Sequence, residues 1–106
     1  MMRTRERDSS KTIVFDIDAI NSPYWGVSRN GVAWILRRSS LGVYLYNLEP
    51  GIIPISVVAS AQSQAGLIAQ PTDIAYSAFN VYIYNHAGTF VDSVHRVICT
   101  ALDRRL

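Results

Sequence analysis

Alternation of apolar and polar residues with a period of two runs through most of this chain, and it constrains the fold more than any other feature. The pattern is plain in TIVFDID, where Ile13, Phe15 and Ile17 alternate with a second set that includes Asp16 and Asp18. It returns in VYLYN and in FNVYIYN, and no segment has the 3.6-residue period of an amphipathic helix. Because successive side chains of a strand point to opposite faces, the pattern predicts strands with one buried face.

Turn signals divide the alternating segments into about seven strands. The strands are predicted at residues 13–18, 24–29, 32–37, 42–47, 54–60, 76–85 and 89–102, the last with a bulge near Asp92. Residues 62–72 are small and polar, so they are read as a loop that holds at most a short edge strand. Asn30-Gly31 fits a two-residue type I′ hairpin, in which both central residues need positive φ. Glu49-Pro50-Gly51 and Asn85-His86-Ala87-Gly88 are further turns.

Many short strands without helices predict an all-β domain. We expect an antiparallel β-sandwich of about seven strands, with a small barrel as the alternative. The chain of 106 residues is long enough for one domain. We place the domain at residues 12–102, after a flexible charged N-terminal arm at 1–11 and before a polar C-terminal tail at 103–106.

The chain is poor in charge for its size. Charged residues make up 17% of it and hydrophobic residues 49%, whereas a typical domain has about 25% charged residues. A small protein has much surface per residue, so the shortfall indicates surface covered by another chain, and a homo-oligomer is the simplest explanation. A lightly charged monomer is the alternative.

The net charge of +2 lies entirely in the arm. The remainder of the chain carries six arginines and six acidic residues and is neutral, which argues against nucleic-acid binding. The arm sets four cations against Glu6 and Asp8. These cations are Arg3, Arg5, Arg7 and Lys11.

Cys99 is the single cysteine and lies in an apolar run, so we expect a buried thiol and no intrachain disulfide. The N-terminus has no apolar segment of the kind found in signal peptides. No run approaches the roughly 18 apolar residues of a membrane span. We therefore expect a protein that contacts no membrane and is made in a reducing cytoplasm.

Residues that carry chemistry are few and scattered. Asp16 and Asp18 point to one face of a strand, but hard cations need more oxygen ligands, so a solvated face is favoured. His86 falls in a hairpin loop, where we expect it to be exposed. His95 falls in a strand, where we expect it to be partly buried. Together with Cys99 the histidines lack the spacing of a zinc site.

No catalytic set is predicted either. Asp92 and His95 are close in sequence, but a strand places them on opposite faces unless a bulge intervenes. The motifs for nucleophilic catalysis, phosphate binding and zinc proteases are absent. We therefore expect no enzyme activity, no metal and no cofactor.

Four tyrosines form the candidate binding surface. Tyr44 and Tyr46 share one strand face, and Tyr82 and Tyr84 share another. Because tyrosine has an apolar ring and a polar tip, it suits partly wet contact surfaces. If the two strands are neighbours, the four rings form one patch that recognises a protein or a glycan. A subunit interface, or packing between the layers of the sandwich, is the alternative.

Three segments carry a resemblance to a known family: GVSRNGVAWIL, PISVVASAQS and SAFNVYIYNHAGTFVDSVHRVICTAL. Their order of hairpin, small-residue strand and closing strand, over residues 25–102, resembles the distal β-sandwich domains of tailed-bacteriophage fibres and spikes. In the closing piece the matching positions are Phe79, Val81, Asn85, Gly88, Asp92, Val94 and Val97.

The resemblance implies a homotrimer on the virion, without a cofactor, made in the host cytoplasm. It also implies that contacts with a host glycan or protein sit in loops at one end of the sandwich. The candidate loop residues are Asn30, Gly31, Asn85 and His86, and the arm with its four cations would anchor the protein to the tail or particle.

The function expected from the sequence is therefore a non-enzymatic, fibre-tip-like structural protein that binds a host receptor or another virion protein. A capsid decoration (cement) protein held by its N-terminal arm is the main alternative. A small carbohydrate-binding module is a weaker one. A small lyase or hydrolase is disfavoured because no nucleophile, base or metal set is in position.

Overall fold

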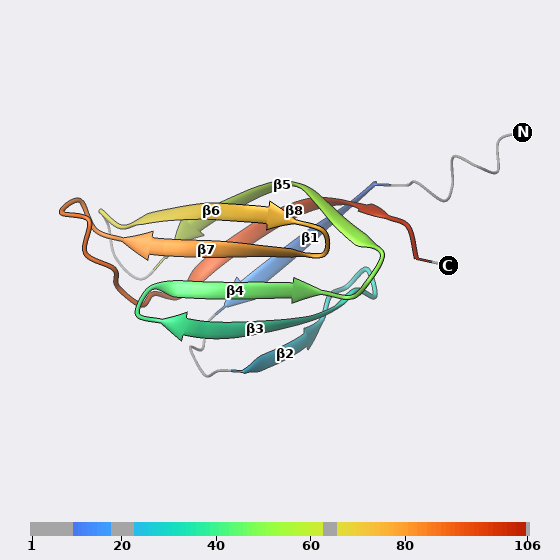
Figure 1. Ribbon diagram of the computed structural model, residues 1–106, viewed down its shortest axis with the longest axis horizontal. Coiled ribbons are helices and arrows are strands. Elements are labelled where there is room, and N and C mark those ends of the chain that lie inside the picture. Colours follow the sequence, from blue (N-terminus) through green and yellow to red (C-terminus); the bar gives the residue numbers. More distant parts are fainter. Residues whose placement is uncertain (1–9, 18–22, 63–65, 106) are drawn as a thin grey trace, which may run out of the picture.

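The computed structural model describes residues 10–17, 23–62 and 66–105, and these form a two-layer antiparallel β-sandwich (Figure 1). One sheet has the order β1-β8-β5 and the other β2-β3-β4-β7-β6. This confirms the predicted fold class. The strands are β1 (Ser10–Ile17), β2 (Tyr24–Val27), β3 (Ala33–Ser40), β4 (Val43–Leu48), β5 (Ile52–Ala61), β6 (Ile68–Ala75), β7 (Ala78–Tyr84) and β8 (His95–Asp103).

The inward faces of the two sheets meet in a single core. The alternation in β1 places Ile13, Phe15 and Ile17 inside, each no more than 2% exposed. The ring of Phe15 lies 4.9 Å from that of Trp34 and 5.3 Å from that of Tyr46. Tyr46 in turn stacks on Phe79 at 4.8 Å. The aromatic rings therefore join β1 to β3, β4 and β7 across the layers.

The segment 62–72, predicted as a loop with at most a short edge strand, holds the first part of an eight-residue edge strand, β6. It pairs with β7, but the register shifts between Thr72 and Ala75, and Asp73 has a positive φ of 51°. β6 is an edge strand, which tolerates Pro71 because one side of it needs no ladder hydrogen bonds. Because its residues are small or polar and include a proline, they do not alternate clearly, and the pattern did not predict this strand.

The hairpin at Asn30-Gly31 is not the predicted two-residue type I′ turn. Of its loop residues only Gly31 has positive φ, at 77°. The N–H of Gly31 donates to the carbonyl of Ser28 (3.0 Å), and the N–H of Ser28 donates to that of Val32 (2.9 Å). This is a three-residue loop in which a turn is followed by a left-handed glycine, the next most common hairpin connection.

The predicted last strand, 89–102, is not continuous: it consists of an isolated bridge and the strand β8. Phe90 makes one bridge to Tyr84, and β8 begins only at His95. The residues between them carry the chain from the five-stranded sheet to the three-stranded one, where the sequence pattern indicated a bulge. The preceding turn is as predicted, with the N–H of Gly88 donating to the carbonyl of Asn85 (2.9 Å).

Other strand boundaries differ from the predicted ones by one to three residues. β5 begins at Ile52 rather than at Pro54, and the proline sits where the register of β5 with β8 shifts. The domain itself begins at Ser10, because Lys11 lies in β1 and its ammonium pairs with Asp103 of β8 at 3.0 Å. Asp103 is the last residue of β8, and Arg105 pairs with Glu49 at 3.1 Å, so these two residues of the predicted polar tail are bound to the sandwich.

Candidate functional site

The four tyrosines do not form the predicted patch. β4 and β7 are neighbours, but their register pairs Tyr44 with Val81 and Tyr82 with Val43. Because paired residues point to the same face, Tyr44 and Tyr46 face the core and are fully buried. Tyr82 and Tyr84 face outward and are partly exposed. The alternative prediction, that the tyrosines pack between the layers of the sandwich, is therefore confirmed for Tyr44 and Tyr46 only.

The candidate loop residues lie at opposite ends of the sandwich. Asn30 and Gly31 are at the end where the described chain starts and finishes, whereas Asn85 and His86 are at the other (Figure 1). The side-chain amide of Asn30 donates to the carbonyl of Thr12 at 2.6 Å. His86 is exposed, as expected. These four residues cannot form the single contact surface at one end that the resemblance implied.

The last two residues of the predicted anchoring arm, Ser10 and Lys11, belong to the sandwich. Lys11 is part of β1, where it pairs with Asp103 and donates to the carbonyl of Asn30 at 3.3 Å. Arg3, Arg5 and Arg7 lie outside the described residues.

The structure describes one of the two carboxylates that the sequence places on one strand face. Asp16 forms a surface ion pair with Arg96 at 2.6 Å, and Asp18 lies outside the described residues. In the part of the chain that the structure describes, no three His, Cys, Asp or Glu side chains gather closely enough to hold a metal ion.

A polar cluster that the sequence did not predict surrounds Asp92. Its carboxylate accepts hydrogen bonds from Arg38 Nε (2.8 Å), the N–H of Gly42 (2.8 Å) and the hydroxyl of Tyr44 (3.2 Å). Burial alone would raise the pKa of Asp92, but these three donors outweigh it and hold the pKa below its ordinary value. Burial raises the pKa of Tyr44 to about 12.

His95 forms the second half of this cluster and is more deeply buried than predicted, at 2% exposed. Its Nδ1 lies 2.9 Å from the carbonyl of Ser93, so this nitrogen carries the proton. The hydroxyl of Tyr46 then donates to Nε2 at 2.7 Å. The neutral ring packs 4.6 Å from that of Tyr44, and burial lowers the pKa of His95.

The aromatic part of the cluster is closed to solvent. Tyr44, Tyr46 and His95 are at most 2% exposed, so a dissolved substrate does not reach them. Cys99 is also buried, which raises its pKa to about 11 and keeps the thiol protonated at neutral pH. The hydrogen bonds hold Asp92 and Ser93 against β3, β4 and the turn between them as the chain crosses between the sheets.

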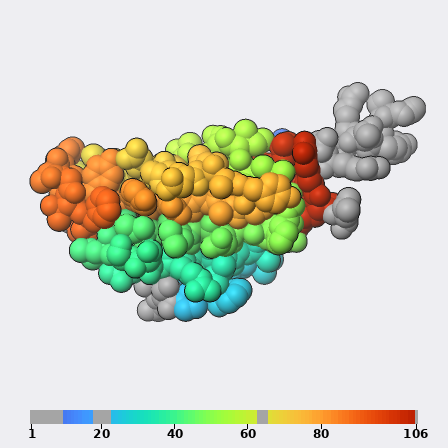
Figure 2. Space-filling model, in the orientation of Figure 1, coloured from blue at the N-terminus to red at the C-terminus, as the bar shows by residue number. Residues whose placement is uncertain are grey.

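The surface of the five-stranded sheet is a better candidate for a binding site than the buried cluster. The outer face consists of the outward side chains of β2, β3, β4, β7 and β6, and Figure 2 views it directly. Trp25 and Val27 are each 72% exposed there, and Ile35, Leu45 and Tyr82 are partly exposed. Most soluble surfaces carry far more charge than this.

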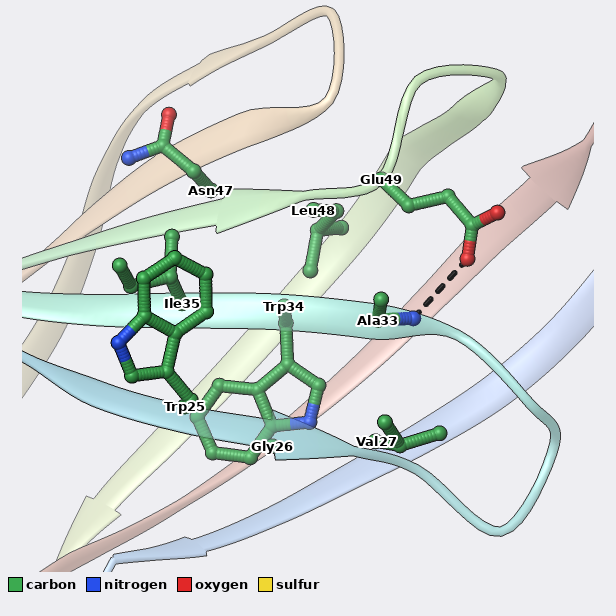
Figure 3. Close-up of a pocket in the computed structure, with 9 residues that line it drawn as sticks. All are labelled: Trp25, Gly26, Val27, Ala33, Trp34, Ile35, Asn47, Leu48 and Glu49. Carbon is green, nitrogen blue, oxygen red and sulfur yellow. Dashed lines mark hydrogen bonds between the residues drawn. The ribbon is translucent and has the colours of Figure 1, made fainter.

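A shallow hollow of about 460 Å³ lies at the β2 side of the outer face (Figure 3). The indole of Trp25 stands beside Ile35, and Glu49 at the rim accepts from the N–H of Ala33 at 3.0 Å. Beneath it, the ring of Trp34 lies against Gly26, where an added Cβ would come within 2.3 Å of that ring. The lining residues are Trp25, Gly26, Val27, Ala33, Trp34, Ile35, Asn47, Leu48 and Glu49.

A second aromatic group occupies the other end of the same face. Phe90 packs on Tyr82 and Tyr84 with centroid distances of 5.6 and 6.0 Å. The hydroxyl of Tyr84 donates to Gln70 at 2.7 Å, and Ile68, paired with Tyr84, is 37% exposed. One end of the outer face thus carries the indole of Trp25 with aliphatic side chains, and the other end carries Tyr82 and Tyr84. Partly exposed aliphatic side chains lie between the two ends.

Comparison with known proteins gave no match with a protein family, a curated protein or a solved structure. Within the residues that the structure describes, no helix is long and apolar enough to span a membrane.

Proposed function

We propose that this chain is a non-enzymatic structural protein of a bacteriophage virion, fibre-tip-like and homotrimeric, that assembles through the outer face of its five-stranded sheet. The observation that carries the proposal is the exposure of Trp25 and Val27, at 72% each, beside an apolar hollow. Contiguous apolar surface of this kind is characteristic of interaction sites. Burying one such side chain contributes about 1.5–3 kcal/mol.

The distribution of charge supports contact between identical copies. The chain outside the arm is neutral, with six arginines and six acidic residues. The outer face carries Arg37 in β3 and Asp73 in β6, whose carboxylate accepts from the side-chain amide of Asn80 at 2.9 Å, while Glu49 lies at the rim of the hollow. Identical faces can therefore approach one another with little like-charge repulsion, and aromatic side chains are the residues that interface cores favour.

The virion setting rests on the resemblance to fibre-tip domains, and the β-sandwich fold is compatible with it. In a trimer built on the outer face, the hairpin loop with Asn85 and His86 stays at one end of each sandwich. That loop is then the natural place for contact with a host receptor or another virion protein, because loops carried by a rigid scaffold commonly hold binding residues.

Light scattering after size-exclusion chromatography tests the proposal on the isolated protein. At tens of micromolar the wild-type chain is expected at the mass of three subunits. Trp25→Glu places a charge on the outer face and is expected to weaken association at least 100-fold, leaving single subunits. The matched control is Val58→Glu, which changes a residue 61% exposed on the opposite sheet, and it is expected to keep the wild-type mass.

The outcomes separate the parts of the proposal. A wild-type protein of single-subunit mass would overturn it. A Trp25→Glu variant with wild-type mass would rule out this face as the interface. A dimer that Trp25→Glu dissociates would retain the interface but overturn the trimer and with it the fibre-tip assignment. Circular dichroism of each variant checks that the sandwich is folded.

A further inference from the structure

The four edges of the two sheets are not alike. β2 has only four residues, β5 contains Pro54 at a shift in register, and β6 contains Pro71 and a positive φ at Asp73. Short strands, prolines and bulges are the means by which proteins prevent unwanted pairing at sheet edges. β1 has none of them, and its eight residues pair with β8 in unbroken register.

The open backbone groups of β1 can be assigned from one hydrogen bond. The carbonyl of Thr12 accepts from the side-chain amide of Asn30 at 2.6 Å, so it points away from β8. In an antiparallel ladder the N–H and C=O of one residue point to the same side, and every second residue repeats this. Val14 and Asp16 therefore also direct both of their backbone groups to the open edge.

There is room for one more strand beside β1. The three-stranded sheet faces a five-stranded one, and β5 packs against β6 and β7, so the excess width falls on the β2 side (Figure 1). There Tyr24 and Trp34 stack at 5.5 Å and remain partly exposed on the inner face. A groove of about 380 Å³ follows the edge and is lined by Thr12, Ile13, Val14, Asp16, Ser28, Arg29, Asn30 and Arg96.

We propose that the β1 edge binds, by strand addition, an extended segment of a partner protein in which apolar and acidic residues alternate. The backbone of the segment pairs with Val14 and Asp16. Its inward side chains cover Tyr24 and Trp34, which calls for apolar residues. Its outward side chains lie beside Arg29, which calls for acidic ones. Strand addition of this kind takes affinity from the backbone and specificity from alternate side chains.

The charges around the groove support the acidic choice. Arg96 is paired with Asp16 at 2.6 Å and Lys11 with Asp103 at 3.0 Å. Arg29 is exposed and forms no ion pair with any residue that the structure describes. Among the described residues, the groove therefore has one positive charge without an acidic partner, at the end where β1 begins.

Two other occupants fit less well. A second copy that offered its own β1 would bring its β2 into the space of the first β2, because each five-stranded sheet extends past β1. The arm of another copy has arginine at positions 3, 5 and 7, on one side of an extended chain. If that side faces outward, its three arginines lie next to Arg29, and the like charges repel one another. A partner strand of the stated composition avoids both this repulsion and the clash between the two β2 strands.

The test uses the full-length chain and the peptide acetyl-EVEVEVE-amide, with acetyl-KVKVKVK-amide as its counterpart. Amide hydrogen exchange followed by NMR reports each residue. Saturating acidic peptide is expected to slow exchange at Val14 and Asp16 at least 10-fold, with little change at Ile13 and Phe15, which already pair with β8. Arg29→Glu is expected to reverse the preference between the two peptides.

Val14→Pro removes one open N–H without removing a hydrogen bond to β8, and it is expected to weaken peptide binding at least 10-fold. Val14→Thr keeps that N–H and is expected to bind as the wild type does.

Unchanged exchange at Val14 and Asp16 would overturn the proposal, as would equal binding of the two peptides or wild-type affinity in Val14→Pro. Equal or stronger protection by a peptide of residues 1–9 would replace the partner strand by the arm of another copy. None of these results bears on the outer face, so they are independent of the oligomeric state.

Discussion

β4 and β7 are neighbouring strands that both contain the sequence Tyr-x-Tyr, yet they use it in opposite ways. Tyr44 and Tyr46 in β4 have no exposed surface. Tyr82 and Tyr84 in β7 lie on the outer face and are partly exposed. The two pairs are one step out of phase, because the ladder sets each tyrosine of β4 opposite an apolar residue of β7.

The register, and not the residue type, therefore decides whether a strand tyrosine is buried with a hydrogen-bond partner or exposed to solvent. A buried hydroxyl must find a partner, since an unpaired buried polar group is costly. Tyr44 bonds Asp92 and the N–H of Ser93, and Tyr46 bonds His95. An outward hydroxyl can bond water, so the pair in β7 is free to serve as contact surface.

The largest expected effect comes from replacing each pair with serine. Tyr44→Ser with Tyr46→Ser removes two core rings, each worth about 3–5 kcal/mol. Because a domain of this size has about 5–15 kcal/mol of stability in total, this variant is expected to be unfolded. Tyr82→Ser with Tyr84→Ser is expected to lose at most about 1–2 kcal/mol. Urea unfolding at a low protein concentration measures both variants without the contribution of assembly.

A folded Tyr44/Tyr46 variant with near-native stability would contradict the assignment of this pair to the core. An unfolded Tyr82/Tyr84 variant would show that the outer pair also supports the fold.

Removing only the hydroxyls sharpens the comparison. Tyr46→Phe leaves the buried Nε2 of His95 without a donor, which costs about 1–3 kcal/mol. Tyr84→Phe removes a hydrogen bond to Gln70 on the surface, where water replaces it, and is expected to cost about 0.5 kcal/mol or less. The two substitutions delete the same atom, so the difference between their unfolding free energies isolates burial. Equal losses would contradict this account.

Alternation alone identified most strands and their buried faces. Phe79, Val81 and Ile83 lie inside as their spacing predicts, and Cys99 is buried as expected. These features are local, because the side to which a residue points depends only on its own strand. The relative phase of β4 and β7 is not local, and the wrong assumption about it produced the single tyrosine patch.

The features that the sequence did not predict arise from contacts between distant residues. Asp92 and Arg38 are 54 residues apart, and the turn at Gly42 brings a third donor to the same carboxylate. Trp25 is exposed because it points to the outer face from β2, the outermost strand of its sheet. A lone tryptophan in a short strand is otherwise as compatible with the core as with the surface.

The smallest expected effect is a pH dependence that belongs to the buried half of the comparison. Burial lowers the pKa of His95, whereas a histidine in the unfolded chain has a pKa near 6.5. Between these two values the unfolded chain binds a proton that the folded protein does not. The free energy of unfolding therefore falls as the pH drops below about 6.5, by at most about 1.4 kcal/mol per pH unit.

Carboxylates do not obscure this window. The pKa values of Asp92 and Asp103 are also lowered by folding, but a shift downward from an ordinary value near 4 affects stability only below about pH 4–5. Urea unfolding at pH 7.5, 6.5 and 5.5 therefore measures His95. His95→Gln should remove the slope, while His86→Gln, which changes the exposed histidine, should retain it. A slope that survives in His95→Gln would mean that the imidazole buried against Tyr44 and Tyr46 is not the group that takes up the proton.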